Sequence, residues 1–195
     1  MATKNGMWFR KNPSQNIPEA QWWEEKCVRR QGGYDFDASN IPPSVRWVPK
    51  GTLLKLMTDT GKARVCKTAE VTIKAESPGT TIKVKDTGML MVGDTLAGSK
   101  ITAISVADNI ATLTVDEVNA VIEAGTVIDD LAETGEKLIG LQYETNDLMG
   151  NDFPQCTPTL VAMEIEKDTL PLPINDKLIE KLNKAGVGIH LFREQ

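Results

Sequence analysis

The sequence predicts a mainly β protein: a small barrel or sandwich built on a duplicated β-hairpin unit, with one short C-terminal helix and an extended N-terminal arm. Three observations lead to this prediction. Residues 71–97 and 101–128 contain the same β pattern twice, a helical pattern occurs near the C-terminus, and the first 46 residues show no apolar periodicity. We therefore expect residues 1–46 to form a docking arm and residues 47–195 to form one compact body.

The arm carries aromatic side chains in an irregular context. All four tryptophans of the chain lie in it or directly after it, and five of the ten prolines lie before residue 50. Because proline and Gly-Gly pairs interrupt regular structure, the most regular structure we expect is one or two helical turns within residues 19–29. Disordered segments are normally poor in aromatic residues, because aromatic side chains bury area that drives ordering. The composition therefore favours a segment that becomes ordered against a surface.

The arm is also mildly basic. Through residue 50 there are eight Lys or Arg and five acids, a local charge of +3; because the whole chain carries −5, the remainder carries −8. Trp and Arg are enriched among the residues that dominate protein–protein binding. We therefore predict docking onto a protein partner through seven residues: Trp8, Arg10, Trp22, Trp23, Arg29, Arg30 and Trp47. The alternative is that the tryptophans fold back onto their own body as a lid.

The body begins with a predicted hairpin. After the Lys-Gly turn at residues 50–51, the segment 52–56 reads as a strand, and residues 63–66 can pair with it across the Asp-Thr-Gly turn at residues 59–61. Such turns are frequent in hairpins. The duplicated unit follows it.

Each copy of the duplicated unit is a hairpin with apolar alternation, followed by a loop and a third short strand. Four apolar positions of the first copy recur in the second at a constant offset of about 31 residues, and one glycine recurs one residue later: Ile73, Ala75, Ile82, Val84 and Gly93 match Ile104, Val106, Leu113, Val115 and Gly125. One copy alone cannot bury its apolar face. We therefore expect the two copies to fold on each other.

The C-terminal part, residues 159–192, reads as strand, helix and strand. Residues 137–143 form an earlier strand, and residues 144–158 form a polar loop. Residues 161–165 alternate with a period of two. The helix has a capping residue at Asn175 or Asp176, an apolar face of Leu178, Ile179 and Leu182, and a glycine stop at Gly186. Residues 187–192 then close the chain as a strand.

The sequence indicates no catalytic, cofactor or metal site, and we expect a protein that is not an enzyme. The one histidine, His190, lies in the predicted last strand, facing solvent, without an orienting partner. The three cysteines are far apart and are expected to be buried thiols. The acids at 129, 130, 133 and 136 lack the spacing of a calcium loop. Neither a phosphate loop nor a dinucleotide fingerprint is present.

Nucleic acid and membrane partners are also disfavoured. The body is acidic, and the basic residues of the arm are interspersed with acids. No apolar run approaches the roughly 20 residues of a membrane span, and the first residues lack the apolar stretch of a signal peptide. We therefore expect synthesis in the cytoplasm.

Several short motifs follow one another along residues 48–192. They are Pro49-Lys-Gly-Thr-Leu53, Val92-Gly-Asp-Thr-Leu96 with Ile101-Thr-Ala-Ile104, Thr159-Leu-Val-Ala-Met-Glu164, and Leu170-Pro-Leu-Pro173 with residues 177–191. In this order they resemble the head-decoration and head-fibre proteins of tailed phages and prophages. The tryptophans of the arm are not part of the resemblance.

The resemblance implies a virion structural protein that binds the outer surface of the capsid, as decoration, cement or head-fibre base. It implies the major capsid protein as partner, possible contacts with other head-fibre or accessory capsid proteins, and a homotrimer at a local three-fold axis. Such a protein is assembled in the host cytoplasm and acts on the virion. The alternative is a carbohydrate- or host-surface-binding module in which tryptophans stack on sugar rings. A hydrolase subunit is a third reading, and it lacks the residues for acid–base catalysis.

Overall fold

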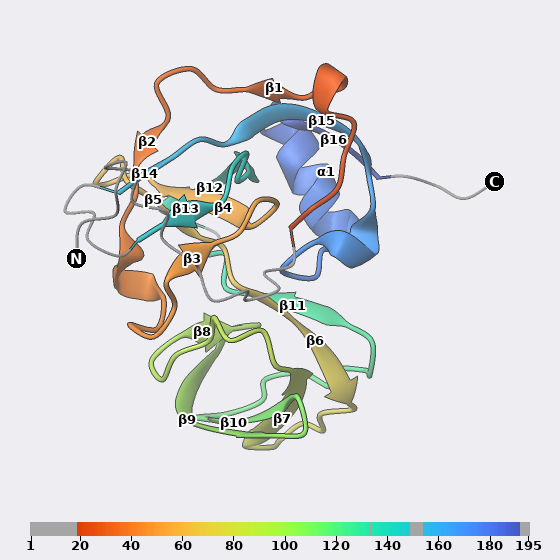
Figure 1. The fold of residues 1–195 in the computed structure, drawn as a ribbon. Coiled ribbons are helices and arrows are strands. Elements are labelled where there is room, and N and C mark those ends of the chain that lie inside the picture. The colour runs from red at the N-terminus through yellow and green to blue at the C-terminus, as the bar shows by residue number, and fades with distance from the viewer. Residues whose placement is uncertain (1–18, 133, 149–153, 192–195) are drawn as a thin grey trace, which may run out of the picture.

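The computed structural model describes residues 19–132, 134–148 and 154–191 and shows two β-rich lobes. We call residues 68–129 the small lobe and the other described residues the large lobe. Strand β6 runs from the large lobe into the small lobe (Figure 1). The predicted mainly β, sandwich-like architecture with one α-helix is confirmed for the described residues, which form several open sheets and no closed barrel.

The large lobe contains the predicted first hairpin. Strands β4 (Leu53–Met57) and β5 (Ala63–Val65) pair antiparallel, and β12 (Glu136–Leu141) pairs with the other edge of β4. Four of the six residues of β12 are buried. The strand therefore lies inside the lobe.

The predicted C-terminal unit is also confirmed. Strands β15 (Thr159–Ile165) and β16 (Gly188–Leu191) are parallel and are connected by helix α1 (Asp176–Lys184). The Asn175 side chain accepts a hydrogen bond from the Leu178 N–H at 2.8 Å, which satisfies one of the free donors at the helix start. Leu178 and Leu182 are buried against the sheet. Local capping and helical spacing together define this element.

The predicted period-two alternation in β15 is wrong. The buried positions are Thr159, Ala162 and Ile165, three residues apart. Glu164 has φ of +55°, and the register with β16 shifts between Ala162 and Ile165. This bulge changes which side chains point inward, which residue types alone do not reveal.

The small lobe has the internal symmetry that the duplication predicts. Its sheet has the order β11-β6-β7-β10-β9-β8. The bounds are β6 Thr68–Ile73, β7 Thr81–Lys85, β8 Thr95–Leu96, β9 Ser99–Ala107, β10 Ile110–Val115 and β11 Val127–Asp129. The third strand of each copy pairs with the first strand of the other copy. Central strands β7 and β10 pair antiparallel, with Ile82 opposite Leu113 on the pseudo-two-fold axis.

The offset between the two copies is not constant, which corrects the sequence alignment. Val71 and Ile101 occupy equivalent places in the first strands, because their carbonyls accept hydrogen bonds from Gly125 and Gly93 at 2.7 and 2.8 Å. The offset is therefore 30 residues there, and 32 for the two glycines. Two of the apolar positions used in the sequence alignment, Ile73 and Val106, are each 53% exposed. The extra residues of β6 and β9, Thr72 and Thr102, are also 30 apart, so the offset changes in the loops between the strands.

Residues 19–46 belong to the folded large lobe, so the predicted boundary at residue 46 is wrong. Strand β1 (Val28–Arg29) pairs with β15, and β2 (Tyr34–Asp35) pairs with β14 (Gln155–Cys156). Strand β3 (Trp47–Val48) pairs with β13 (Asn146–Asp147). The regular helical structure within residues 19–29 is one 3-10 turn, Glu24–Lys26. Four side chains of this segment join the cores of the lobe: Ala20, Trp22, Phe36 and Ile41.

An ion pair adds to these contacts. The Asp37 carboxylate accepts bonds from the Ser39 N–H at 2.9 Å and from two nitrogens of Arg64 in β5 at 2.9 and 2.6 Å. Burial opposes ionisation of Asp37, but these hydrogen bonds and the charge of Arg64 outweigh it and lower its pKa to about 2. The folded state therefore holds the ionised carboxylate more firmly than the unfolded chain does.

We expect Arg64→Ala to reduce stability most above about pH 4, the region where Asp37 is ionised in both states. Because the folded pKa is below the unfolded value of 3.8, this contribution is lost as pH falls from about 4 to about 2. The difference in melting temperature between wild type and variant should therefore shrink over that range. Thermal unfolding from pH 6 to pH 2 measures it. A difference that is the same at every pH contradicts the assignment.

Candidate functional site

In the part of the chain that the structure describes, a cation lies over every Trp and Tyr ring. The distances to the ring centroids are 4.3 to 5.3 Å, for Lys26 on Trp23, Arg29 on Tyr143, Arg30 on Tyr34, Arg46 on Trp47 and Lys50 on Trp22. Significant cation–π pairs occur about once per 70–80 residues, so this density is high. We call the first four pairs, which are at least partly exposed, the cation–aromatic surface.

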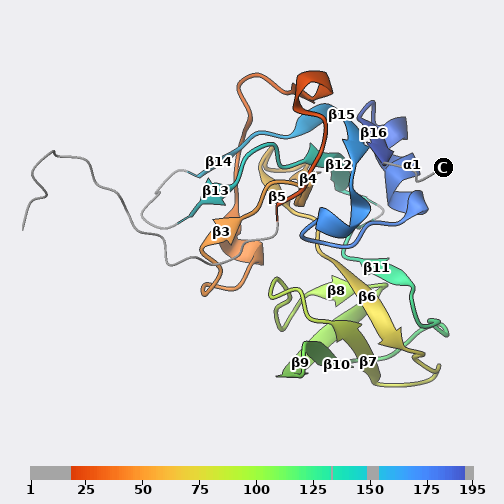
Figure 2. The same cartoon turned by 45° about the vertical axis from the view of Figure 1, so that its right-hand side comes forward.

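Short strands and their partners hold this surface in place. Arg29 lies opposite Thr159 of β15, and the Arg30 N–H donates to the Pro158 carbonyl at 2.9 Å. Trp47 pairs with Asp147 across β3 and β13. Strands β2, β3, β13 and β14 lie on the side of the large lobe away from α1 (Figures 1 and 2). The surface therefore follows the outside of the large lobe from β1 to β3.

Trp22 is not part of the surface, which corrects its predicted docking role. Its side chain is 8% exposed and belongs to the core that packs on α1, with its ring 6.4 Å from that of Tyr143. The Ala20 N–H donates to Lys50 at 3.1 Å and the Trp23 N–H donates to Met163 at 3.0 Å, which fixes the chain on both sides of Trp22. For this tryptophan the lid alternative is right.

Of the other six predicted docking residues, Trp8 and Arg10 lie outside the described residues. The remaining four, Trp23, Arg29, Arg30 and Trp47, lie on the cation–aromatic surface, and Trp23 is 42% exposed. The exposed Val28 extends the apolar area near Trp23, because β1 and Trp23 both bond to β15. Whether these residues contact a partner stays a prediction.

The cations of the surface differ in how far the protein already uses them. Arg46 donates two hydrogen bonds to Asp147 at 3.1 and 2.8 Å and is therefore engaged. Arg29 pairs with Glu144 at 3.0 Å, but both side chains are more than half exposed, so solvent weakens the pair. Lys26 and Arg30 have no acidic partner among the described residues. Arg30 stacks on Tyr34 and keeps its donors free for a carboxylate.

Four members of the surface were missed from the sequence: Lys26, Tyr34, Arg46 and Tyr143. The adjacency of Arg46 and Trp47 is a local signal that could have identified one pair. Tyr143 has no such signal, because only the folding of the chain brings it under Arg29.

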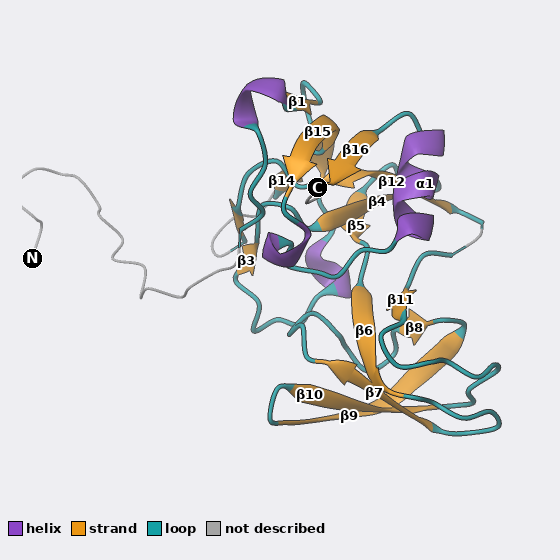
Figure 3. Ribbon diagram, turned by 90° about the vertical axis from the view of Figure 1, so that its right-hand side faces the viewer, coloured by secondary structure: helices purple, strands orange, loops and turns teal. Residues whose placement is uncertain are grey.

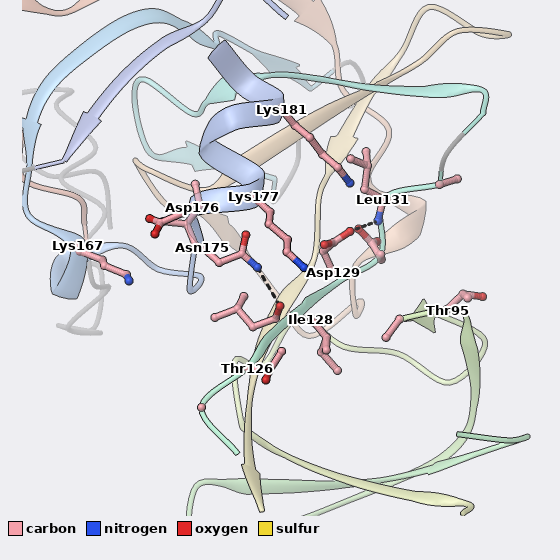
Figure 4. A pocket seen from close by; sticks show the side chains of 17 residues that line it. Thr95, Thr126, Ile128, Asp129, Leu131, Lys167, Asn175, Asp176, Lys177 and Lys181 are labelled. Carbon is pink, nitrogen blue, oxygen red and sulfur yellow. Dashed lines mark hydrogen bonds between the residues drawn. The ribbon is translucent and has the colours of Figure 1, made fainter. Parts of the chain in front are cut away.

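Apart from the cation–aromatic surface, a cleft lies where the two lobes meet (Figure 4). This open cleft has a volume of about 1060 Å³, and Lys177 and Lys181 extend from α1 toward the segment that carries Asp129. Asn175 caps α1 with its oxygen and donates its amide N–H to the Val127 carbonyl at 3.0 Å. The polar groups that join the lobes are therefore already paired within the chain.

Buried ion pairs lie at the start of β6, beside the cleft. Lys67 Nζ lies 2.5 Å from Asp94, and its side chain is fully buried. Lys55 pairs with Asp130 at 3.1 Å and with Glu136 at 3.0 Å. The Lys67–Asp94 pair links the large lobe to the small lobe, and the pairs of Lys55 lie within the large lobe.

The remaining reactive side chains are structural or exposed singly. Cys66 and Cys156 are buried, and burial raises the pKa of both thiols, that of Cys156 to about 12. His190 is exposed in β16, as expected. In residues 19–132, 134–148 and 154–191, no three His, Cys, Asp or Glu side chains are grouped as metal ligands. Within the same residues, no helix has the length and apolar character needed to cross a membrane.

Comparison with known protein families, with characterised proteins and with solved structures gives no match.

Proposed function

We propose that this protein is a non-enzymatic virion structural protein that binds the outer surface of a phage capsid, as decoration, cement or head-fibre base. The cation–aromatic surface, together with residues 1–18, forms the attachment site. The major capsid protein is its partner, with other head-fibre or accessory capsid proteins as further contacts, and nucleic acid and membranes are not partners. The observation that carries this proposal is the exposed Trp23 with Lys26 over its ring, because Lys26 has no acidic partner among the described residues.

The chemistry of the surface matches an apolar, acidic partner. Interface cores are enriched in Trp, Tyr and Arg, and charged groups there need partners across the interface. Trp23 supplies apolar area, and Arg30 supplies a planar donor held by Tyr34 at 4.3 Å. A capsid face that presents carboxylates beside an apolar recess satisfies both.

Glu19, the first described residue, lies next to this surface. The Thr145 hydroxyl donates a hydrogen bond to the Glu19 carboxylate, and Thr145 lies between Tyr143 and Asp147 in sequence. Trp8 and Arg10 therefore add contacts to the same partner.

A protein partner is favoured over a sugar. Lys26 and Arg46 each occupy a face of the rings of Trp23 and Trp47, the faces on which a sugar would stack. We also propose a homotrimer on the capsid, as the family resemblance implies. Short outer strands such as β1 and β16 offer edges that neighbouring subunits can cover.

We expect the double variant Trp23→Ala, Arg30→Ala to weaken capsid binding at least roughly 30-fold, about 2 kcal/mol or more, if these residues are hot spots. Its melting temperature should stay close to wild type, because both side chains are exposed. Co-sedimentation with empty capsids, beside thermal unfolding, measures the two effects.

The matched control is Val121→Ala, Lys137→Ala, which removes an exposed apolar and an exposed basic side chain elsewhere. It should bind like wild type. Trp22→Ala should instead lower the melting temperature, because Trp22 is in the core. If the double variant Trp23→Ala, Arg30→Ala binds capsids as tightly as wild type, the proposed function is contradicted.

A further inference from the structure

The internal symmetry of the small lobe is broken at one strand edge. On the first copy, the outer edge of β6 and of the residues after it is covered by residues 122–129 of the second copy. Val71 exchanges hydrogen bonds with Gly125 and Thr126 at 2.7 and 2.9 Å, and beyond β6 Ala75 exchanges two with Ile122 at 2.9 and 3.0 Å. The equivalent edge of β9 should be covered by the equivalent segment of the first copy.

That cover ends at the third residue of β9. Ile101 exchanges hydrogen bonds with Gly93 and Asp94, both at 2.8 Å, which matches the contacts of Val71. Beyond Ile101, no described residue pairs with this edge, so the counterpart of the Ala75–Ile122 pair is missing. Strand β9 continues for six residues past this point, to Ala107. One side of this stretch is paired with β10 and the other is open.

The open edge presents backbone groups that can form hydrogen bonds. Successive residues of a strand direct their N–H and C=O groups to opposite sides. Strand β9 has one extra residue between Ile101 and Ala103, because these two lie opposite the consecutive residues Val115 and Thr114. Ala103, Ser105 and Ala107 therefore direct their groups toward β10, and Ile104 and Val106 direct theirs toward the open edge. Within the described chain, none of these groups has a partner on that side. A row of free donors and acceptors is therefore available for another strand.

The side chains of this edge do not prevent pairing. Natural proteins protect exposed edges with Lys, Pro, bulges or covering segments. Residues 102–107 read Thr-Ala-Ile-Ser-Val-Ala, without charge or proline, and Val106 is 53% exposed. This stretch has the composition of a strand that pairs with another.

We propose that β9 pairs edge to edge and antiparallel with β9 of a second copy of this chain, about a two-fold axis at Ser105. In this register Ile104 lies opposite Val106 of the second copy, so the outward-directed groups of the two strands meet and their side chains form an apolar cross-strand contact. Ser105 lies opposite Ser105 of the second copy. An uncharged strand meets itself without electrostatic repulsion.

The lobe already contains such a contact. Its equivalent strands β7 and β10 pair antiparallel around Ile82 and Leu113, so like-with-like pairing about a two-fold axis suits this sheet. Two-fold dimers are also the commonest homo-oligomers. Strand β9 lies at the far end of the small lobe from β1 and β3 (Figure 3). The contact therefore goes beyond the proposed function: it leaves the cation–aromatic surface free, and on a capsid it joins copies from neighbouring trimers.

The first test compares Val106→Pro with Val106→Thr in the full chain. The Val106 N–H faces the open edge, so proline there removes a donor to the second copy and leaves the ladder with β10 intact. In sedimentation velocity at micromolar concentration, wild type and Val106→Thr should contain two chains, or a multiple of two. Val106→Pro should contain half as many, with a melting temperature close to that of Val106→Thr.

The second test reads the register. Because Ser105 bonds to β10, Ser105 and its counterpart form a non-hydrogen-bonded antiparallel pair, whose Cα atoms are about 4.5 Å apart, within the range of a disulfide. Ser105→Cys should therefore form a covalent dimer on mild oxidation. Val92→Cys, whose native side chain is 60% exposed outside β9, should not.

A wild-type particle with one chain, or equal cross-linking of the two cysteine variants, overturns the proposal. A trimer that Val106→Pro does not alter also overturns it, while leaving the proposed capsid attachment intact. Capsid binding lost on substitution of Trp23 and Arg30 tests that attachment separately.

Discussion

Removal of residues 1–46 is expected to abolish folding of the rest of the chain, whereas removal of residues 1–18 is expected to leave the fold intact. Trp22, Phe36 and Ile41 are each at most 8% exposed and pack in the two cores of the large lobe. Full burial of one large apolar side chain contributes about 1.5–3 kcal/mol, so these three contribute about 5–9 kcal/mol. The total stability of a domain is about 5–15 kcal/mol.

The deletion also opens strand edges. Without residues 28–37, β15 and β14 lose their partners β1 and β2. The outer edge of β5 is exposed as well, because the Asp37 N–H donates to the Ala63 carbonyl at 2.8 Å. Open edges of this kind pair between molecules. The shortened chain should therefore aggregate as well as unfold.

Chains 19–195 and 47–195 provide the comparison, with circular dichroism and thermal unfolding as readouts. Chain 19–195 should unfold cooperatively near the melting temperature of the full chain. Chain 47–195 should be insoluble or show no cooperative transition. A cooperative transition in chain 47–195 would restore the boundary at residue 46 and make residues 19–46 a separable arm.

The elements that could be predicted from sequence are those whose signals are local. The duplicated hairpins have alternating apolar residues and turns such as Ala-Asp-Asn, where Asp108 and Asn109 both take positive φ. Helix α1 has its own cap and apolar spacing. The exchange of third strands between the two copies has no local signal, because β8 and β11 are short and their partners are set by the fold.

The docking residues show the same limit at the level of one residue. Trp22 and Trp23 are adjacent and identical, yet one is 8% exposed and the other 42%. Composition can identify the segment as one that orders against a surface. It cannot choose which ring faces the core, because that choice depends on the bond from the Trp23 N–H to Met163, far along the chain. The same argument applies to Tyr143 under Arg29.

Asp94→Ala is expected to lower the free energy of unfolding by about 3–5 kcal/mol, because it leaves the buried Lys67 without its partner. Lys67 is fully buried, and burial, acting against its pair with Asp94, lowers its pKa below the usual 10.5. Asp94 also accepts a bond from the Met91 N–H at 2.7 Å. Asp94→Asn keeps an oxygen for Met91 and loses the charge, which separates the two contributions.

The second copy of the repeat suggests the compensating variant. Thr126 occupies the position of Asp94, because the Val71 N–H donates to Thr126 as the Ile101 N–H donates to Asp94. The double variant Lys67→Met, Asp94→Thr removes both charges together. Replacing a buried ion pair with apolar groups is often neutral or stabilising, so we expect this variant to lie within about 1 kcal/mol of wild type.

Urea unfolding at constant m value measures these differences. The deficit of Asp94→Ala should shrink as pH rises from 7 toward 10. Lys67 without Asp94 keeps a folded pKa below its unfolded value, so the unfolded state binds more protons and stability rises with pH relative to wild type. Equal deficits for Asp94→Ala and for the double variant, or a deficit that does not change with pH, would show that the cost comes from lost packing and not from an unpaired buried charge.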